Sequence, residues 1–318
     1  MGFGLYGYFR DAGNYYDGAD PGHLLIENAT MEYIESVAEG DRWHCTPAAY
    51  WPLGASVSFF AYAPRMNPAD GVLVIPALQT ASMPGGTYTV PADPKEQPDL
   101  CLAAPVLDWS AAKGDVPLRF SHALTRVLFF FNADGTFYEG NAYRFKVKSL
   151  RLDGIAGQNS FAFDSWSGFR WDNLPRENLA SRTGSYALSL SEGTLADAFL
   201  PLENELTTQE GLERFVQVNK DHEGILYLLP QPMTTLGSVT VELAAYRYDD
   251  ASGNWVEDDA PVMETAVIPL PDTTVWQPGT TVCYSATLDA TYYLGVQFRV
   301  TLLDWEGNAI EDVEFNHE

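Results

Sequence analysis

Two apolar, aromatic-rich segments place the strongest limits on how this chain of 318 residues can fold. They are residues 51–64, WPLGASVSFFAYAP, and residues 116–132, VPLRFSHALTRVLFFFN. β-Branched and aromatic residues predominate in 56–62, and Pro64 ends that run because proline cannot donate to a strand ladder. Both segments therefore predict strands in the middle of a core.

The second segment changes its pattern part of the way along. Phe120, His122 and Leu124 share one face at period two, whereas residues 127–131 are apolar on both faces. This pattern suits a strand buried on both sides or a strand that changes sheet at a bulge. We interpret His122 as a buried, hydrogen-bonded core histidine rather than a catalytic base, because its neighbour Ser121 would face the opposite side.

Composition favours a β-rich globular protein. Aromatic residues make up 13% of the chain, and 26 glycines and 20 prolines divide it into short runs. Long stretches with helical periodicity are missing, so we predict an all-β fold with two packed sheets in each domain and very little helix. The formal net charge of −25 would repel phosphate backbones, which excludes nucleic acids as partners.

The length corresponds to two domains at the usual size of about 150 residues each. Turn-forming residues in 133–141, ADGTFYEGN, mark the boundary between them. We therefore predict an N-terminal β-sandwich domain, residues 1–141, and a C-terminal β-sandwich domain, residues 142–318.

Period-two patterns predict strands on both sides of this boundary. The expected elements are strands at 3–9, 57–62, 72–75, 120–131 and 281–288, a strand from Tyr143 that Asp153 and Gly154 end, and a hairpin turning near 251–254. The alternation is cleanest in 294–302, where Leu294, Val296, Phe298, Val300 and Leu302 share one face. Residues 207–215 are the best helix candidate, with Thr207 or Thr208 as N-cap.

The three cysteines, Cys45, Cys101 and Cys283, are far apart and show no C-x-x-C spacing. Neither a zinc site nor a disulfide framework follows from this pattern. We expect mostly buried, unreactive thiols. One disulfide stays open if the protein is exported, but three cysteines do not define a pairing.

Motifs for catalysis or cofactor binding are missing from the sequence. It contains no G-x-S-x-G, H-E-x-x-H, phosphate loop or dinucleotide fingerprint, so we predict a non-enzymatic protein without cofactors or a bound metal. Five acidic residues flank one predicted turn: Asp249, Asp250, Glu257, Asp258 and Asp259. A weak calcium site there is the alternative to the solvated turn that we favour.

Four tryptophans, Trp109, Trp166, Trp171 and Trp255, are candidates for stacking on sugars. Flat aromatic rings pack on sugar faces as they do on other apolar surfaces. The competing interpretation, which we favour, places these rings in the core of large β domains or at its rim.

Taken together, the two opening segments and three later motifs resemble the Bacteroidales fimbrillin-like family, the subunits of type V pili. The matching patterns are W-P then F-F-A-Y-x-P in 51–64, F-x-H-A-L in 120–124, YLLPQ in 227–231, W-x-P-G-x-x-x-x-Y in 276–284, and the late Trp305. Each pattern is weak by itself, but their order and spacing together are fairly specific to the family.

The resemblance implies two tandem β-sandwich domains of transthyretin-like type. It also implies a lipoprotein that is exported to the cell surface and outer membrane and becomes part of a fimbrium, where members join other pilus subunits by strand exchange. The chain opens in mid-strand, so we expect a lipid-accepting leader and a first strand to precede residue 2. Membrane contact would come only through that lipid anchor.

Within that family we predict a tip or accessory subunit. Residues 308–318 are rich in carboxylates and poor in large apolar groups, which makes them a poor donor strand. The five apolar residues of 294–302 are the candidate strand-exchange contacts, with a permanent core strand as the competing interpretation. The alternative function is a surface β-sandwich lipoprotein that binds glycans, and host or bacterial surface glycans or proteins are the candidate adhesion partners.

Overall fold

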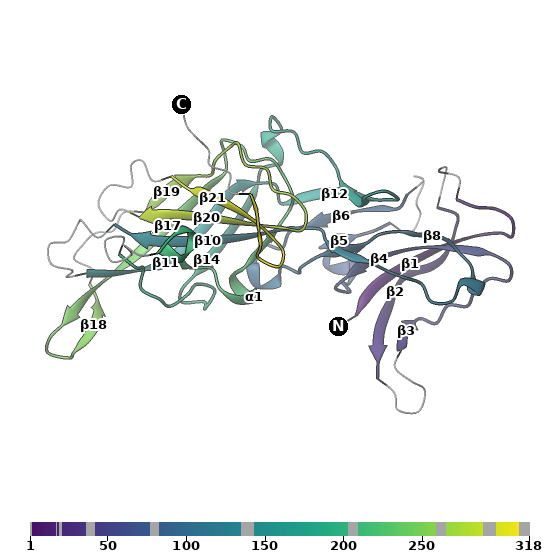
Figure 1. Cartoon of the computed structure of the whole chain (residues 1–318), viewed down its shortest axis with the longest axis horizontal. Coiled ribbons are helices and arrows are strands. Elements are labelled where there is room, and N and C mark those ends of the chain that lie inside the picture. The colour runs from purple at the N-terminus through teal and green to yellow at the C-terminus, as the bar shows by residue number, and fades with distance from the viewer. Residues whose placement is uncertain are drawn as a thin grey trace. The chain divides into compact units, whose positions relative to one another are not determined.

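The computed structural model describes residues 2–16, 18, 21–35, 42–76, 83–134, 143–202, 209–258, 265–288 and 297–311 (Figure 1). The chain forms two compact units. Unit 1 consists of Met1–Val90, Pro98–Leu124 and Gln158–Leu174, and unit 2 consists of Pro91–Gln97, Thr125–Gly157 and Pro175–Glu318. The two units are thus interleaved along the chain.

The predicted domain boundary at residue 141 lies outside the described residues. The strands on either side of it, β10 (Thr125–Ala133) and β11 (Tyr143–Ile155), both belong to unit 2. Residues Gln158–Leu174 return to unit 1, because their strand β12 (Gln158–Asp164) pairs with β6 (Gly85–Thr89) in that unit. Neither unit is therefore one continuous stretch of the chain.

The larger sheet of unit 1 has the first predicted strand near its centre. Its order is β3 (Arg42–Thr46), β2 (His23–Ile34), β1 (Phe3–Arg10), β4 (Ser56–Ala63), β7 (Cys101–Ala103) and β9 (Phe120–His122), and β8 (Val106–Trp109) also pairs with β4. β1 is antiparallel to both β2 and β4. The strand predictions at 3–9 and 57–62 are confirmed.

The smaller sheet of unit 1 packs against the larger one. Its order is β13 (Gly168–Trp171), β12, β6 and β5 (Leu73–Val74). The rings of Phe60 on β4 and Phe163 on β12 have centroids 5.3 Å apart, so side chains of the two sheets meet. Both rings are buried, as a sandwich core requires.

The second aromatic-rich segment divides between the units, and this selects one of its two expected structures. β9 pairs with β7 in unit 1, whereas β10 begins three residues later and enters a sheet of unit 2. The link, Ala123 and Leu124, is completely buried. The segment therefore changes sheet, and the run that is apolar on both faces belongs to β10.

The larger sheet of unit 2 contains one parallel pair. Its order is β15 (Val216–Gln217), β10, β20 (Thr280–Leu288), β21 (Arg299–Asp304) and β22 (Ala309–Glu311), and β16 (Leu226–Leu228) also pairs with β10. β10 and β20 are parallel from Arg126↔Thr281 to Ala133↔Leu288. Val127, Phe129 and Phe131 of β10 are fully buried.

The second sheet of unit 2 is antiparallel. Its order is β14 (Gly184–Ser189), β11, β17 (Ser238–Asp249) and β18 (Asn254–Glu257), and β19 (Ala266–Pro269) also pairs with β17. The predicted hairpin is confirmed by β17 and β18, which follow each other and pair. The prediction that Asp153 and Gly154 end a strand is wrong. Gly154 has φ 77° at a bulge, and β11 continues to Ile155.

Short helical turns complete the described structure. They are η1 (Pro68–Asp70), η2 (Pro94–Glu96), η3 (Ala111–Lys113), η5 (Leu179–Ser181), η7 (Gly211–Arg214) and α1 (Asp221–Gly224). The predicted helix 207–215 starts outside the described residues, and its described part contains only the 3₁₀ turn η7, at whose start Gly211 has φ 57°. In the described part of the chain, none of the helices could span a membrane. The all-β prediction is confirmed.

Two of the sequence motifs meet in unit 2. The backbone of Gln231, in YLLPQ, exchanges two hydrogen bonds with the backbone of Trp276, in WQPGTTVCY: Gln231 N donates to Trp276 O at 3.1 Å, and Trp276 N donates to Gln231 O at 2.8 Å. The buried Trp276 indole then donates to the Tyr284 hydroxyl at 2.8 Å. Motifs 45 residues apart are therefore parts of one structural connection.

Candidate functional site

The strand β21 is paired along its whole length on one side and only near its end on the other. β20 pairs with it from Thr280↔Asp304 to Ser285↔Arg299. On the other side, β22 pairs only with Leu302 and Leu303. Within the described part of the chain, no strand pairs with the beginning of β21 on that side. Unpaired backbone groups at a sheet edge are a template for an added strand.

The residues predicted for strand exchange lie in and before β21. Leu294 and Val296 lie outside the described residues. Phe298 and Val300 are buried, and the Phe298 ring centroid is 5.3 Å from that of Tyr284. Leu302 is half-buried and lies opposite Val282 of β20. Phe298 and Val300 thus fill the core of unit 2, and backbone groups are what the outer edge of β21 can offer a partner.

Three of the four candidate sugar-stacking tryptophans are half-buried and contact other parts of their own units. Trp109 Nε1 donates to Gly114 O at 3.0 Å, and Trp171 Nε1 donates to Ala123 O at 2.8 Å. In unit 2, the Trp255 ring packs against Phe199 at 5.8 Å. These contacts place the three rings at the rims of the cores. Trp109 and Trp171 belong to different sheets of unit 1, and Trp255 belongs to unit 2.

Trp166 differs from the other three because its side chain is almost completely exposed, at 97%. It lies in the turn between β12 and β13, where the Asp164 carboxylate accepts hydrogen bonds from the backbone N of Trp166 at 2.9 Å and of Ser167 at 2.8 Å. The bonds from Ser167 and Trp166 lower the pKa of Asp164. The turn is therefore fixed by its own polar groups, and the indole ring is available for contact with another molecule.

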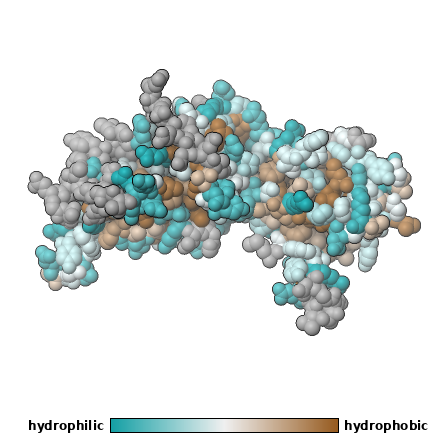
Figure 2. Space-filling model, viewed as in Figure 1, coloured by the Kyte–Doolittle hydropathy of each residue, from teal (hydrophilic) through white to brown (hydrophobic). Residues whose placement is uncertain are grey.

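Exposed apolar side chains also occur elsewhere in unit 1. Tyr50 and Leu53, in the turn before β4, are 85% and 103% exposed. On the face shown in Figure 2, apolar residues gather in patches in both units, and hydrophilic residues lie between the patches. Exposed apolar residues that lie together are typical of contact surfaces, whereas single ones are common on any protein.

His122 is not the buried core histidine that we predicted. Its side chain is 33% exposed and lies beside Asp99 and Cys101. The thiols also differ from the prediction, because Cys283 is buried but Cys45 and Cys101 are only half-buried, and all three are unpaired. The spacing D-x-C, followed by a histidine on a second predicted strand, is the signal for this cluster in the sequence.

The acidic turn between β17 and β18 forms hydrogen bonds within itself. The Asp249 carboxylate accepts from Ala251 N and Ser252 N, both at 3.2 Å. A hydrogen bond from the Ser252 side chain lowers the pKa of Asp249 most, and the bond from Ala251 N lowers it further. Asp258 forms an ion pair with Arg247 at 3.1 Å. Asp259 lies outside the described residues. These contacts account for Asp249 and Asp258 without a bound ion.

A comparison with models of known protein families identifies one family. A family model described as fimbrillin-like matches residues 14–305. The search of curated proteins gives no match. Among solved structures, a fimbrial protein from Bacteroides vulgatus superposes with a TM-score of 0.64 at 16% identity, over 95% of this chain and 92% of that one.

A second solved structure, described as a candidate cell adhesion protein from Bacteroides uniformis, superposes with a TM-score of 0.46 at 16% identity. The match covers 95% of this chain and 91% of that one. At such identities, the likeness to the Bacteroides vulgatus protein shows a shared fold and nothing about individual residues.

Proposed function

Because this chain belongs to the fimbrillin-like family, we propose that it is a non-enzymatic structural and adhesive subunit of a cell-surface pilus, in a tip or accessory position, and that it joins its neighbour by strand exchange. The proposal includes export and a lipid anchor at the outer membrane, as the family resemblance implies. Its partners are other pilus subunits.

The unequal pairing of β21 is the observation that supports this proposal. An extended segment of a neighbouring subunit would continue the sheet beside Arg299, Val300 and Thr301, next to the short strand β22. Such β-augmentation provides affinity through backbone hydrogen bonds and specificity through pockets for alternate side chains.

The free energies of strand addition show how many apolar side chains the partner segment must bury. Each new backbone hydrogen bond contributes about 1 kcal/mol, and each apolar side chain buried contributes about 2 kcal/mol. Ordering and association together cost roughly 4–15 kcal/mol. The edge of β21 is short, so about five apolar side chains of the partner would have to find pockets for a lasting junction.

Immunogold labelling of pili from a piliated strain that expresses the protein tests the proposal directly. We expect label on the pili, and at their ends if the subunit occupies the tip. Label along the whole shaft would contradict the tip position but keep the pilus assignment. Absence of label from the pili would overturn the proposed function.

Thiol crosslinking tests the edge of β21. We expect Arg299→Cys, in a chain that also carries Cys45→Ser, Cys101→Ser and Cys283→Ala, to crosslink to a neighbouring subunit in purified pili when a maleimide–succinimidyl ester reagent joins the thiol to a lysine amine of that neighbour. The control, Val256→Cys, places a thiol at an exposed position of β18 in the other sheet. Equal crosslinking from both positions, or none from Arg299→Cys in assembled pili, would count against this edge.

The exposed ring of Trp166 supports a second candidate function, glycan binding at the cell surface. Flat rings at exposed turns pack on the apolar faces of sugars. On a glycan array, binding that Trp166→Ala abolishes and Tyr50→Ala retains would favour it, since Tyr50 is also an exposed aromatic residue of unit 1. Binding that both variants retain would exclude the Trp166 ring as the contact.

A further inference from the structure

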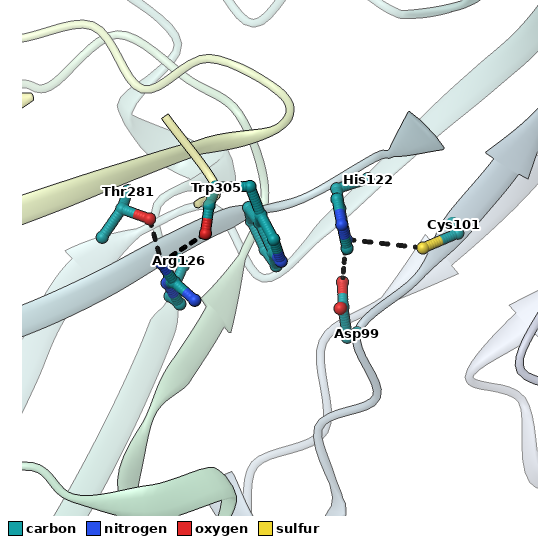
Figure 3. A network of polar contacts seen from close by, with 6 residues as sticks. All are labelled: Asp99, Cys101, His122, Arg126, Thr281 and Trp305. Atoms are coloured by element: carbon teal, nitrogen blue, oxygen red, sulfur yellow. Dashed lines mark hydrogen bonds and ion pairs between the residues drawn. The ribbon is translucent and has the colours of Figure 1, made fainter. Parts of the chain in front are cut away.

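Asp99, Cys101 and His122 lie together on one face of the strand pair β7–β9 in unit 1 (Figure 3). Cys101 is directly opposite His122 in the antiparallel register. Asp99 precedes Cys101 by two residues, and residues two apart in extended chain point to the same side. The pairing of β7 with β9 therefore brings a carboxylate, a thiol and an imidazole to one place.

The three groups converge on a single atom. His122 Nδ1 lies 2.9 Å from Asp99 Oδ1 and 3.5 Å from Cys101 Sγ, and all three atoms lie within 4.8 Å of one another. A Cys–His–Asp catalytic relay uses the two different nitrogens of the ring, one for the nucleophile and one for the carboxylate. Here both neighbours approach the same nitrogen, which is the arrangement of ligands around a common ion.

The separations fit a tetrahedral metal site. Typical Zn–S and Zn–N distances of about 2.3 and 2.0 Å place sulfur and nitrogen ligands roughly 3.5 Å apart at the tetrahedral angle. This is the separation of Cys101 Sγ and His122 Nδ1. Asp99 Oδ1 would have to move a few tenths of an ångström away from the ring, to about 3.3 Å, to become the third ligand.

The backbone that carries these ligands is held firmly. Leu100 and Leu102 alternate with the ligands, point to the other face, and are fully buried. Ala123 N donates to Leu100 O at 2.8 Å, and Ala104 N donates to Arg119 O at 2.9 Å, so hydrogen bonds bracket the strand pair at both ends. A site on anchored strands keeps its ligands in position better than one on a loop.

The ligands are nevertheless accessible to solvent. The side chains of Asp99 and His122 are each 33% exposed, so an ion can enter and a water molecule can take a fourth position. We propose that Asp99 Oδ1, Cys101 Sγ and His122 Nδ1 bind a borderline-soft divalent metal ion of the Zn²⁺ type. Thiolate and imidazole ligands select such an ion over Ca²⁺ and Mg²⁺, which prefer oxygen ligands only.

Binding exchanges a proton for the ion. Cys101 loses its thiol proton to solvent, the sulfur–metal bond forms, and His122 binds through unprotonated Nδ1. Because binding releases a proton, metal affinity should rise with pH near neutrality. The bound ion would connect β7 to the edge strand β9.

Titration of the reduced full chain with Co²⁺ and Zn²⁺ tests the proposal. We expect one Co²⁺ per chain, a thiolate-to-cobalt charge-transfer absorption, and its displacement by Zn²⁺ but not by Ca²⁺ or Mg²⁺. Cys101→Ser should lose the charge-transfer absorption, and His122→Gln and Asp99→Asn should each weaken binding by at least about tenfold.

Zn²⁺ should also raise the melting temperature of the unaltered protein and not that of Cys101→Ser.

Cys45→Ser is the matched control. Cys45 is also a half-buried free thiol of unit 1, and its neighbour His44 points to the other side of β3. The Cys45→Ser variant should retain the charge-transfer absorption and the rise in melting temperature with Zn²⁺.

Absence of a charge-transfer absorption in the unaltered protein would overturn the proposal, and so would an absorption that survives in Cys101→Ser. Circular dichroism of each variant separates loss of the site from loss of the fold, and His122→Gln provides the test if Cys101→Ser does not fold.

Discussion

At the scale of single residues, buried polar side chains connect distant segments of unit 2. The Gln231 carboxamide oxygen accepts hydrogen bonds from Ala156 N at 2.7 Å and from Arg182 Nη1, and its nitrogen donates to Leu229 O at 3.0 Å. Gln231 and Arg182 are only 2% and 5% exposed, and burial lowers the pKa of Arg182. Gln231 Oε1 accepts from Arg182 Nη1, whereas Arg182 Nε and Nη2 are buried without a partner among the described residues, so removing this acceptor would be costly.

Replacing this glutamine should therefore destabilise unit 2. We expect Gln231→Leu to lower the free energy of unfolding by about 3 kcal/mol, because Ala156 N and the buried Arg182 charge lose their acceptor. Urea unfolding measures the change. The exposed Gln277→Leu should stay within about 0.5 kcal/mol. Adding Arg182→Met to Gln231→Leu should recover part of the loss, and failure to recover any would contradict this explanation.

Cys283 gives the protein a specific response to alkaline pH. Burial raises its pKa from 9.0 to about 12 in the folded protein. Above about pH 9 the unfolded thiol ionises while the folded one stays protonated, so the unfolded state is favoured by about 1.4 kcal/mol per pH unit. This stability is fully present below pH 9 and is lost between about pH 9 and 12.

Cys283→Ala should therefore change the pH profile in a particular way. At pH 7 the variant should be less stable by about 1 kcal/mol, because a buried group is lost. By about pH 11 it should be the more stable of the two proteins, because it has no thiol to ionise. Chemical denaturation at a series of pH values measures both curves. If the free energies of unfolding of the two proteins change with pH in the same way from pH 8 to 11, the pKa of Cys283 is not raised in the folded protein.

At the scale of elements, Gly154 allows β11 to continue through its bulge. A Cβ atom at this position would overlap the carbonyl oxygen of Leu236, and φ is 77°. Gly193 has nearly the same φ, 76°, with open space around it. Substitution of Gly193 would therefore introduce backbone strain alone, whereas substitution of Gly154 would introduce backbone strain and steric overlap.

We expect Gly193→Ala to cost about 1–2 kcal/mol, from the left-handed backbone alone. Gly154→Ala should cost about 2 kcal/mol more than that, because β11 must also move away from Leu236. Thermal or urea unfolding of both variants measures the difference. Equal losses would mean that the close approach at Gly154 is relieved without cost.

Individual strands were largely predictable from the sequence, and the positions where they stop were not. Period-two alternation is a local signal, so the predicted strands around β1, β4 and β20 are present. The continuation of β11 past Gly154 depends on its pairing with β14 across a bulge, and the break before β10 depends on which sheet each half joins. Both are set by tertiary contacts, which periodicity does not contain.

The same limit applies to the candidate site. The D-x-C spacing of Asp99 and Cys101 is visible in the sequence, but their position beside His122 requires the register of β7 with β9. The nearest sequence neighbour of His122 is Ser121, which faces the other side, whereas its contacts Asp99 and Cys101 belong to another segment of the chain. Pairing register is specified by burial of one face, and here Leu100 and Leu102 supply it.

At the scale of the whole molecule, the interleaved units determine which fragments can fold. A fragment ending at residue 141 contains β6 but not β12, its antiparallel partner. It would expose the Phe60 side chain that packs on Phe163. We expect this fragment to lack a cooperative unfolding transition by circular dichroism.

A second fragment, which contains β12 and β13, tests whether their absence prevents cooperative unfolding of the fragment 1–141. In the second fragment, a flexible Gly/Ser linker joins Leu124 to Gln158, and the chain ends at Leu174, so all three segments with the strands of unit 1 are present. We expect cooperative unfolding for this fragment. If the fragment 1–141 unfolds cooperatively instead, β12 and β13 are dispensable and the division into units is wrong.

The chain crosses between the units after Val90, Gln97, Leu124, Gly157 and Leu174, and this would have a mechanical consequence for the proposed pilus subunit. In a tandem arrangement, a single peptide linker would bear all the tension between two domains. Here the chain passes between the units five times, so separating the units would pull on the chain at several points. The same interleaving that makes the chain hard to divide into fragments would make the subunit hard to unravel under tension.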